Sequence, residues 1–137
     1  MTARVLALMF LAIVCVAGSY GTDPFLPPTI VSAASAAIGT SQCLGHTWTN
    51  EGAGGTIILD LPKASVGQRC TFVVVTAQLL TVNPNIADRF IQAGVATFAD
   101  GDALQGAATI GTTVTIYAVN ATRWVVTSQT GTWSDVN

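Results

Sequence analysis

Short apolar runs separated by turn residues fill the sequence from Thr56 to Trp133 and limit what the chain can fold into. The runs are rich in Val, Ile, Thr and aromatic residues, and Gly, Pro, Asn and Asp separate them, which is typical of strands joined by turns. After Thr40 no helical spacing of useful length is present, apart from a possible turn over residues 86–91. The segments expected to form strands are Thr56–Leu61, Cys70–Ala77, Leu79–Asn83, Arg89–Gln92, Ala96–Ala99, Thr112–Val119, Arg123–Ser128 and Thr132–Ser134.

This pattern predicts an all-β fold, a small sandwich, jelly roll or barrel of about eight short strands, preceded by an apolar N-terminal segment and a Pro-rich arm. The clearest local feature is a hairpin, because the strand ending at Val119 is followed by the short link Asn120–Thr122 and a second strand. Alternation within these strands assigns one face to the core. The expected core residues are Trp48, Phe72, Val74, Val114, Ile116, Trp124 and Val126.

The composition favours a folded protein that associates with other protein subunits. A length of 137 residues suits one domain with a core, and charged residues make up 9% of the chain with a formal net charge of −2. Lys and Arg number five and none are adjacent, so the basic footprint of a nucleic-acid-binding protein is missing. Subunit interfaces often use such sparsely charged surfaces, so we expect an oligomer and no nucleic-acid partner.

The N-terminal segment, residues 1–20, has the order of a secretory signal, because Arg4 precedes the unbroken apolar run Val5–Gly18. The run is shorter than the roughly 20 residues that a straight transmembrane helix needs. An uncleaved anchor is the alternative, and it would make this segment the chain's contact with a membrane. A third interpretation places the run inside the fold as a buried strand or helix.

Residues 21–42 are rich in Pro, Ala and Ser and predict a linker or an arm. Pro24, Pro27 and Pro28 exclude a regular helix from the first half and favour an extended spacer. An arm of this kind would lie along a neighbouring subunit, whereas a plain linker would connect the leader to the β module. The domain boundaries are therefore a leader over 1–20, an arm or linker over 21–42 and a β module over 43–137.

Residues with catalytic or metal-binding chemistry are few. His46 is the sole histidine and lies in a loop-like stretch, so a surface or capping role is favoured over a triad. Asp100 and Asp102 flank Gly101 in a turn that lacks the other ligand positions of a calcium loop. Asp60 is expected to face solvent from a strand, and the Asn120–Thr122 sequon is explained by turn chemistry. The sequence predicts no enzyme activity, no cofactor and no metal site.

Cys43 and Cys70 are the cysteines that would remain after removal of the leader. An exported chain with two cysteines can join them in a disulfide, and their Cα atoms would then lie within about 7 Å of each other. Their spacing does not match a CxxC redox or zinc motif. A buried free thiol at Cys70 is the alternative, because this residue opens an apolar strand.

Six phrases follow one another in a fixed order and spacing. They are Trp48–Ile57, Leu59–Gly67, Thr71–Val75, Leu80–Pro84, Ile110–Ile116 and Arg123–Trp133. Together they resemble a β module that recurs in structural proteins of tailed bacteriophages, of tail-fibre, spike or head-decoration type. The resemblance covers about residues 47–134, and it depends on the order and spacing of the phrases rather than on any one of them. It implies a protein that is not an enzyme and that is often trimeric.

The sequence therefore predicts a virion structural or decoration protein, localised in the virion and assembled with itself as a homotrimer and with other virion proteins. Two sequence features support self-association: uncharged strands that need a cover, and an apolar arm without a partner in its own module. The alternative is a secreted bacterial or archaeal surface or filament subunit that uses the same module. The export-like segment favours this alternative, since a particle assembled in the cytoplasm needs no signal.

Overall fold

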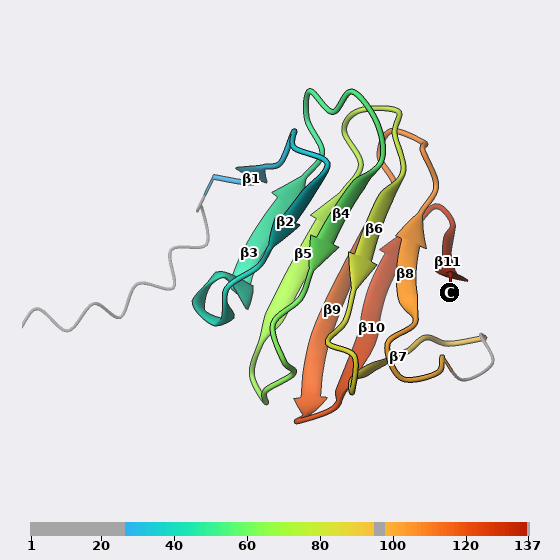
Figure 1. The fold of residues 1–137 in the computed structure, drawn as a ribbon. Helices are drawn as coiled ribbons and strands as arrows, with labels where there is room; N and C mark the ends of the chain where they lie inside the picture. Colours follow the sequence, from blue (N-terminus) through green and yellow to red (C-terminus); the bar gives the residue numbers. More distant parts are fainter. Residues whose placement is uncertain (1–26, 95–97, 137) are drawn as a thin grey trace, which may run out of the picture.

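The computed structural model describes residues 27–94 and 98–136 and shows eleven strands in two mixed sheets that face each other (Figure 1). The all-β fold class is confirmed. The six-stranded sheet contains β1 (Thr29–Ile30), β3 (Leu44–Thr49), β5 (Arg69–Val73), β7 (Arg89–Ile91), β9 (Thr113–Asn120) and β10 (Arg123–Thr130). The five-stranded sheet contains β2 (Ser35–Ala37), β4 (Ile57–Asp60), β6 (Leu80–Asn83), β8 (Ala103–Gly106) and β11 (Trp133–Val136).

The chain passes from one sheet to the other at almost every connection. Up to β9, odd-numbered strands belong to the six-stranded sheet and even-numbered strands to the five-stranded sheet. In the first half, β1, β3 and β5 are therefore parallel neighbours, as are β2, β4 and β6. The second half adds antiparallel strands, with β9 beside β5, β8 beside β6 and β11 beside β8.

This pairing differs from two of the expected architectures. Jelly rolls and up-and-down barrels are built from antiparallel strands. Here five of the nine strand pairs in the described residues are parallel, including β7 with β10. The sequence does not predict this pairing, because a parallel pair needs a long crossover, and each crossover here includes a strand of the opposite sheet.

The core lies between the two sheets and follows the predicted alternation. In β9, Val114, Ile116 and Ala118 point inward and are fully buried, while Thr113 and Tyr117 are half-buried on the outer face. The residues expected in the core all contribute to it: Trp48, Phe72, Val74, Val114, Ile116 and Trp124 are buried, and the half-buried Val126 packs against them.

The prediction that residues 21–42 form an arm or linker is wrong from Thr29 onward. β1 pairs in parallel with β3, and β2 pairs in parallel with β4, so this segment supplies the outermost strand at one end of each sheet. Val31 and Ile38 are buried in the common core. The boundary drawn at residue 43 therefore falls within the folded unit, because alternating small and apolar residues let even short segments complete a sheet. The predicted leader lies outside the described residues.

Most expected strands coincide with observed ones, two differ, and β3 and β8 were not expected within the β module. The segment Ala96–Ala99 falls partly outside the described residues, and the strand nearest to it is β8. β3 was missed because its first half contains Gly45 and His46, which are typical of a loop. The expected strand Cys70–Ala77 ends at Val73, after which the chain turns toward β6.

The uncharged strands that were expected to need a cover are interior strands. β5 lies between β3 and β9, and β9 lies between β5 and β10, so their backbone groups are paired within the chain. The edge strands are β1 and β7 in one sheet and β2 and β11 in the other, and each has four residues or fewer. Very short edges are a common protection against edge-to-edge pairing. Self-association therefore needs a basis other than open edges.

Gly106 allows β11 to close one side of the core. The Trp133 ring lies over Gly106, and a Cβ at this position would stand 2.8 Å from Trp133 Cη2. We expect Gly106→Ala to lower the free energy of unfolding by about 1–3 kcal/mol, because the buried ring must shift. Urea denaturation measures the loss. Gly54→Ala is the matched control, since nothing lies within 4 Å of its added Cβ, and equal losses in both variants would contradict this account.

Candidate functional site

The structure joins Cys43 and Cys70 in a disulfide. Their Cα atoms are 5.0 Å apart, inside the expected limit, and both residues are fully buried. Cys43 ends the 3-10 turn η1 (Thr40–Cys43), and Cys70 is the second residue of β5. The bond therefore ties the entry of β3 to its parallel neighbour. Neither sulfur is available as a free nucleophile or metal ligand.

His46 lies on β3 and pairs in register with Cys70. Its Nδ1 is buried without a hydrogen-bond partner among the described residues. Two ion pairs form among the described residues, Lys63 with Asp88 and Arg89 with Asp100. Neither contains His46, so no carboxylate among these residues orients its ring by an ion pair. Within the described ranges, His, Cys, Asp and Glu side chains form no group of three that could hold a metal ion.

The turn around Gly101 uses its carboxylates for structure. Asp102 Oδ2 accepts a hydrogen bond from the Ala99 amide at 2.7 Å, and Asp100 Oδ1 pairs with Arg89 Nε at 2.7 Å. Gly101 has a φ of +87° and donates its amide to the Asp88 carbonyl. Both acids are therefore occupied, as a plain turn predicts.

The link between β9 and β10 is also explained by turn chemistry. Asn120 Oδ1 accepts hydrogen bonds from the Thr122 amide at 2.9 Å and from Thr122 Oγ1 at 3.2 Å. Asn120 belongs to β9 and pairs with Arg123, so the link is Ala121 and Thr122 alone. The sequon residues stabilise the hairpin that they connect.

Asn50 is a buried polar residue that sequence reasoning missed. Its Oδ1 accepts hydrogen bonds from the amides of Val75 and Thr76, and its Nδ2 donates to the carbonyls of Thr76 and Gln78. The four distances lie between 2.8 and 3.1 Å. One side chain thus fixes the path between β5 and β6. A single Asn after a strand carries no such signal in the sequence.

Replacing Asn50 with alanine is expected to lower the free energy of unfolding by about 2 kcal/mol, because four backbone groups lose their partner. Asn50→Asp should also destabilise, since a carboxylate keeps the two acceptor contacts but cannot donate to the two carbonyls. Thermal and urea unfolding would measure both. Neutral behaviour of both variants would show that water replaces the amide and that the loop does not depend on it.

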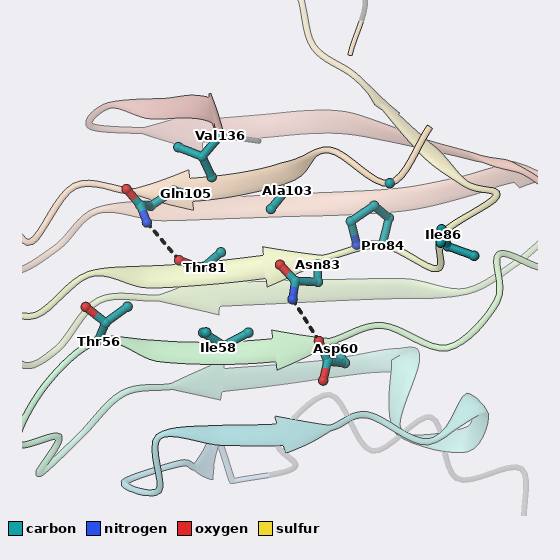
Figure 2. A pocket seen from close by; sticks show the side chains of 11 residues that line it. Thr56, Ile58, Asp60, Thr81, Asn83, Pro84, Ile86, Ala103, Gln105 and Val136 are labelled. Carbon is teal, nitrogen blue, oxygen red and sulfur yellow. Dashed lines mark hydrogen bonds between the residues drawn. The ribbon is translucent and has the colours of Figure 1, made fainter. Parts of the chain in front are cut away.

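A groove of about 510 Å³ lies on the outer face of the five-stranded sheet (Figure 2). Figure 2 shows the side chains of β4, β6 and β8 pointing into it, with Val136 of β11 at one side. The register across β4, β6 and β8 makes two rows, in which Ile58 lies beside Thr81 and Gln105, and Asp60 beside Asn83. The lining residues are Thr56, Ile58, Asp60, Thr81, Asn83, Pro84, Ile86, Gly101, Ala103, Gln105 and Val136.

Among the described residues that line the groove, Asp60 is the one charged side chain. Its Oδ1 accepts a hydrogen bond from Asn83 Nδ2 at 2.9 Å, and nearby Gln105 Nε2 donates to Thr81 Oγ1 at 2.9 Å. The strongly exposed Ile86 forms an apolar lip at one end. Asp60 was expected to face solvent, and it is exposed. One carboxylate beside amides and aliphatic carbons can accept hydrogen bonds from a cation, but it has no second acid or base for proton transfer.

The outer face of the six-stranded sheet carries a different group of side chains at one end. Arg69 pairs with Tyr117, Tyr117 with Val125, and Val125 with Ile91, so these four residues form a row across four strands. Val119 lies next to the row on β9, and it and Ile91 are exposed. We call Arg69, Ile91, Tyr117, Val119 and Val125 the Arg–Tyr patch. It contains no acidic residue.

Acidic residues gather on the other sheet. Besides Asp60 in the groove, Asp135 lies on β11 near Asp102. Desolvation and then the nearby Asp102 charge raise the pKa of Asp135 above its usual range. The charged residues on the strands thus differ in sign between the sheets, with Asp60 and Asp135 in one and Arg69, Arg89 and Arg123 in the other.

Comparisons with known proteins leave the family open. A scan against protein-family models and a search of the curated proteins found no match to this sequence. Within the described ranges, the structure contains no helix with the length and apolar character that a membrane span requires.

Proposed function

We propose that the chain is a structural or decoration protein of a virion, a small β-sandwich that assembles on a particle or tail surface and catalyses no reaction. The Arg–Tyr patch is the observation that carries this proposal. Protein interfaces are enriched in Tyr and Arg and depleted in Lys, Glu and Asp at their centre. The patch has this composition on the outer face of a sheet, where a partner can pack against it.

The patch also offers a surface for self-association, which the short sheet edges and the segment 21–42 do not. Ile91 and Val119 expose apolar surface beside the half-buried Tyr117. Burial of such surface against a partner is favourable by about 25 cal/mol for each Å² removed from water. The homotrimer stays a prediction of the family resemblance, and other virion proteins remain the proposed further partners.

A secreted surface or filament subunit is the second candidate, and the disulfide between Cys43 and Cys70 favours it. Disulfides form and persist in oxidising compartments such as the periplasm or the cell exterior. A virion protein would acquire the bond after release from the cell. The two candidates share the proposal of assembly and differ in location.

Fractionation of the natural source distinguishes the candidates. Density-gradient bands of particles and the washed cell envelope would be compared by quantitative mass spectrometry. We expect the chain at a fixed copy number relative to other particle proteins. Enrichment in the envelope without particles would favour the surface subunit, and a soluble cytosolic protein found in neither fraction would contradict both. The first residue of the mature chain, read from the same samples, tests the predicted leader.

A further inference from the structure

We infer that the groove on the five-stranded sheet receives Arg69 from the Arg–Tyr patch of a second copy of this chain. The inference rests on the proposed function, because it names the contact through which copies assemble. In this contact the Arg69 guanidinium of one copy donates to the Asp60 carboxylate of another. The groove and the Arg–Tyr patch of each molecule carry these two opposite charges.

The groove suits an arginine side chain. Of the groove-lining residues that the structure describes, Asp60 carries the sole charge, and Asn83 Nδ2 donates to Oδ1 of this carboxylate at 2.9 Å. Oδ2 is a second acceptor on the same carboxylate. The aliphatic side chains of Ile58 and Ile86 line the same space and can pack against the arginine stem. Its volume of about 510 Å³ is ample for one extended side chain. A guanidinium, with its planar fork of donors, matches a carboxylate better than an ammonium does.

Arg69 is the arginine best placed to enter. It is exposed, and neither of the two ion pairs formed among the described residues involves it. It is the first residue of β5, an interior strand, and lies beside Tyr117. Arg123, by contrast, lies beside Arg89, which is already paired with Asp100. When a partner covers Arg69, its charge is shielded from water, which strengthens the ion pair.

The position of the two surfaces determines how copies arrange. The groove and the patch lie on the outer faces of opposite sheets. A contact between different surfaces is heterologous, so every bound copy still presents one free groove and one free patch. Because these surfaces point in opposite directions, copies add in a line, and a ring of three does not close. The inferred contact therefore leads to a filament-like series of oligomers in place of the homotrimer that the family resemblance predicts.

Sedimentation velocity on the full chain over a range of concentrations tests the contact. We expect Asp60→Arg and Arg69→Asp each to weaken self-association at least about 10-fold, because each leaves like charges facing each other. The double variant D60R/R69D restores the ion pair with its signs exchanged, so association should return toward the original strength. An equal mixture of the two single variants should likewise associate more strongly than either alone. Glu51→Arg is the control, since Glu51 is exposed in a turn outside both surfaces.

The sedimentation results distinguish the inferred contact from the proposed self-assembly. Association that persists in both single variants, or that the double variant does not restore, overturns the inferred contact and leaves the proposed assembly standing. A series that stops at three copies likewise overturns it. A full chain that stays monomeric at high micromolar concentration contradicts both the contact and the proposed self-assembly. Circular dichroism of every variant separates lost association from lost folding.

Discussion

Replacing Trp124 with alanine is expected to lower the free energy of unfolding by about 3–5 kcal/mol. Trp124 is among the largest fully buried side chains, and it enters the core at the start of β10, beside Ala118 of β9 and Phe90 of β7. Truncation leaves a cavity between the sheets that strands on both sides cannot fill without breaking their register. Urea denaturation, monitored by circular dichroism because the indole is removed, measures the loss.

Two neighbouring substitutions provide the controls. Trp124→Phe should cost much less, because it keeps most of the volume and removes an indole N–H that has no partner among the described residues. Val125→Ala changes the next residue, which faces outward and is half-buried, and we expect a loss below about 1 kcal/mol. A loss below about 1 kcal/mol for Trp124→Ala would place this residue outside the core.

Reducing the bond between Cys43 and Cys70 is expected to lower the free energy of unfolding by about 3–4 kcal/mol, as the chain-entropy relation gives for a closed loop of this size. The two cysteines are 27 residues apart in the sequence. The cross-link removes freedom from the unfolded chain, and both residues are fully buried in the folded one. Reduction by external thiols should therefore be slow until the protein unfolds.

The comparison is best made in a Cys15→Ser background, where these two cysteines are the remaining ones. Denaturation curves with and without reductant then differ by the cross-link alone, and thiol titration under denaturing conditions confirms its state. The double variant C43A/C70A should be at least as unstable as the reduced protein, because it also loses buried sulfur atoms. Identical curves for oxidised and reduced protein would show that the cross-link does not stabilise the fold.

The strands that sequence reasoning located are those with strong alternation. β9 and β10 could be placed because buried Val, Ile and Trp alternate with Thr and Tyr, and a two-residue link joins them. β3 and β8 could not be placed, because Gly45 and Gly106 are typical of loops. Trp48 and Leu104 in the same two strands are nevertheless buried. The sequence also did not predict which strands pair, because alternation shows which face of a strand is buried but not which strand lies beside it.

The groove was not predictable for a related reason. Asp60 could be assigned to an exposed face, but Asn83 and Gln105 belong to strands far along the chain, and the register alone brings these side chains together. The two sequence arguments for self-association share one assumption, that an uncharged strand or an apolar segment without a local partner must find one in another subunit. Distant parts of the same chain cover the uncharged strands and Val31, whereas Ile30 stays exposed.

The parallel arrangement of β2, β4 and β6 gives the five-stranded sheet a constant step. Ser35 pairs with Ile58 and Ile58 pairs with Thr81, so each circuit between equivalent positions of the five-stranded sheet takes 23 residues. A segment of this length, inserted at a turn, would add one strand to each sheet and leave the register of its neighbours intact. The fold can therefore lengthen by whole circuits during evolution, widening both outer faces while the antiparallel half closes the far end unchanged.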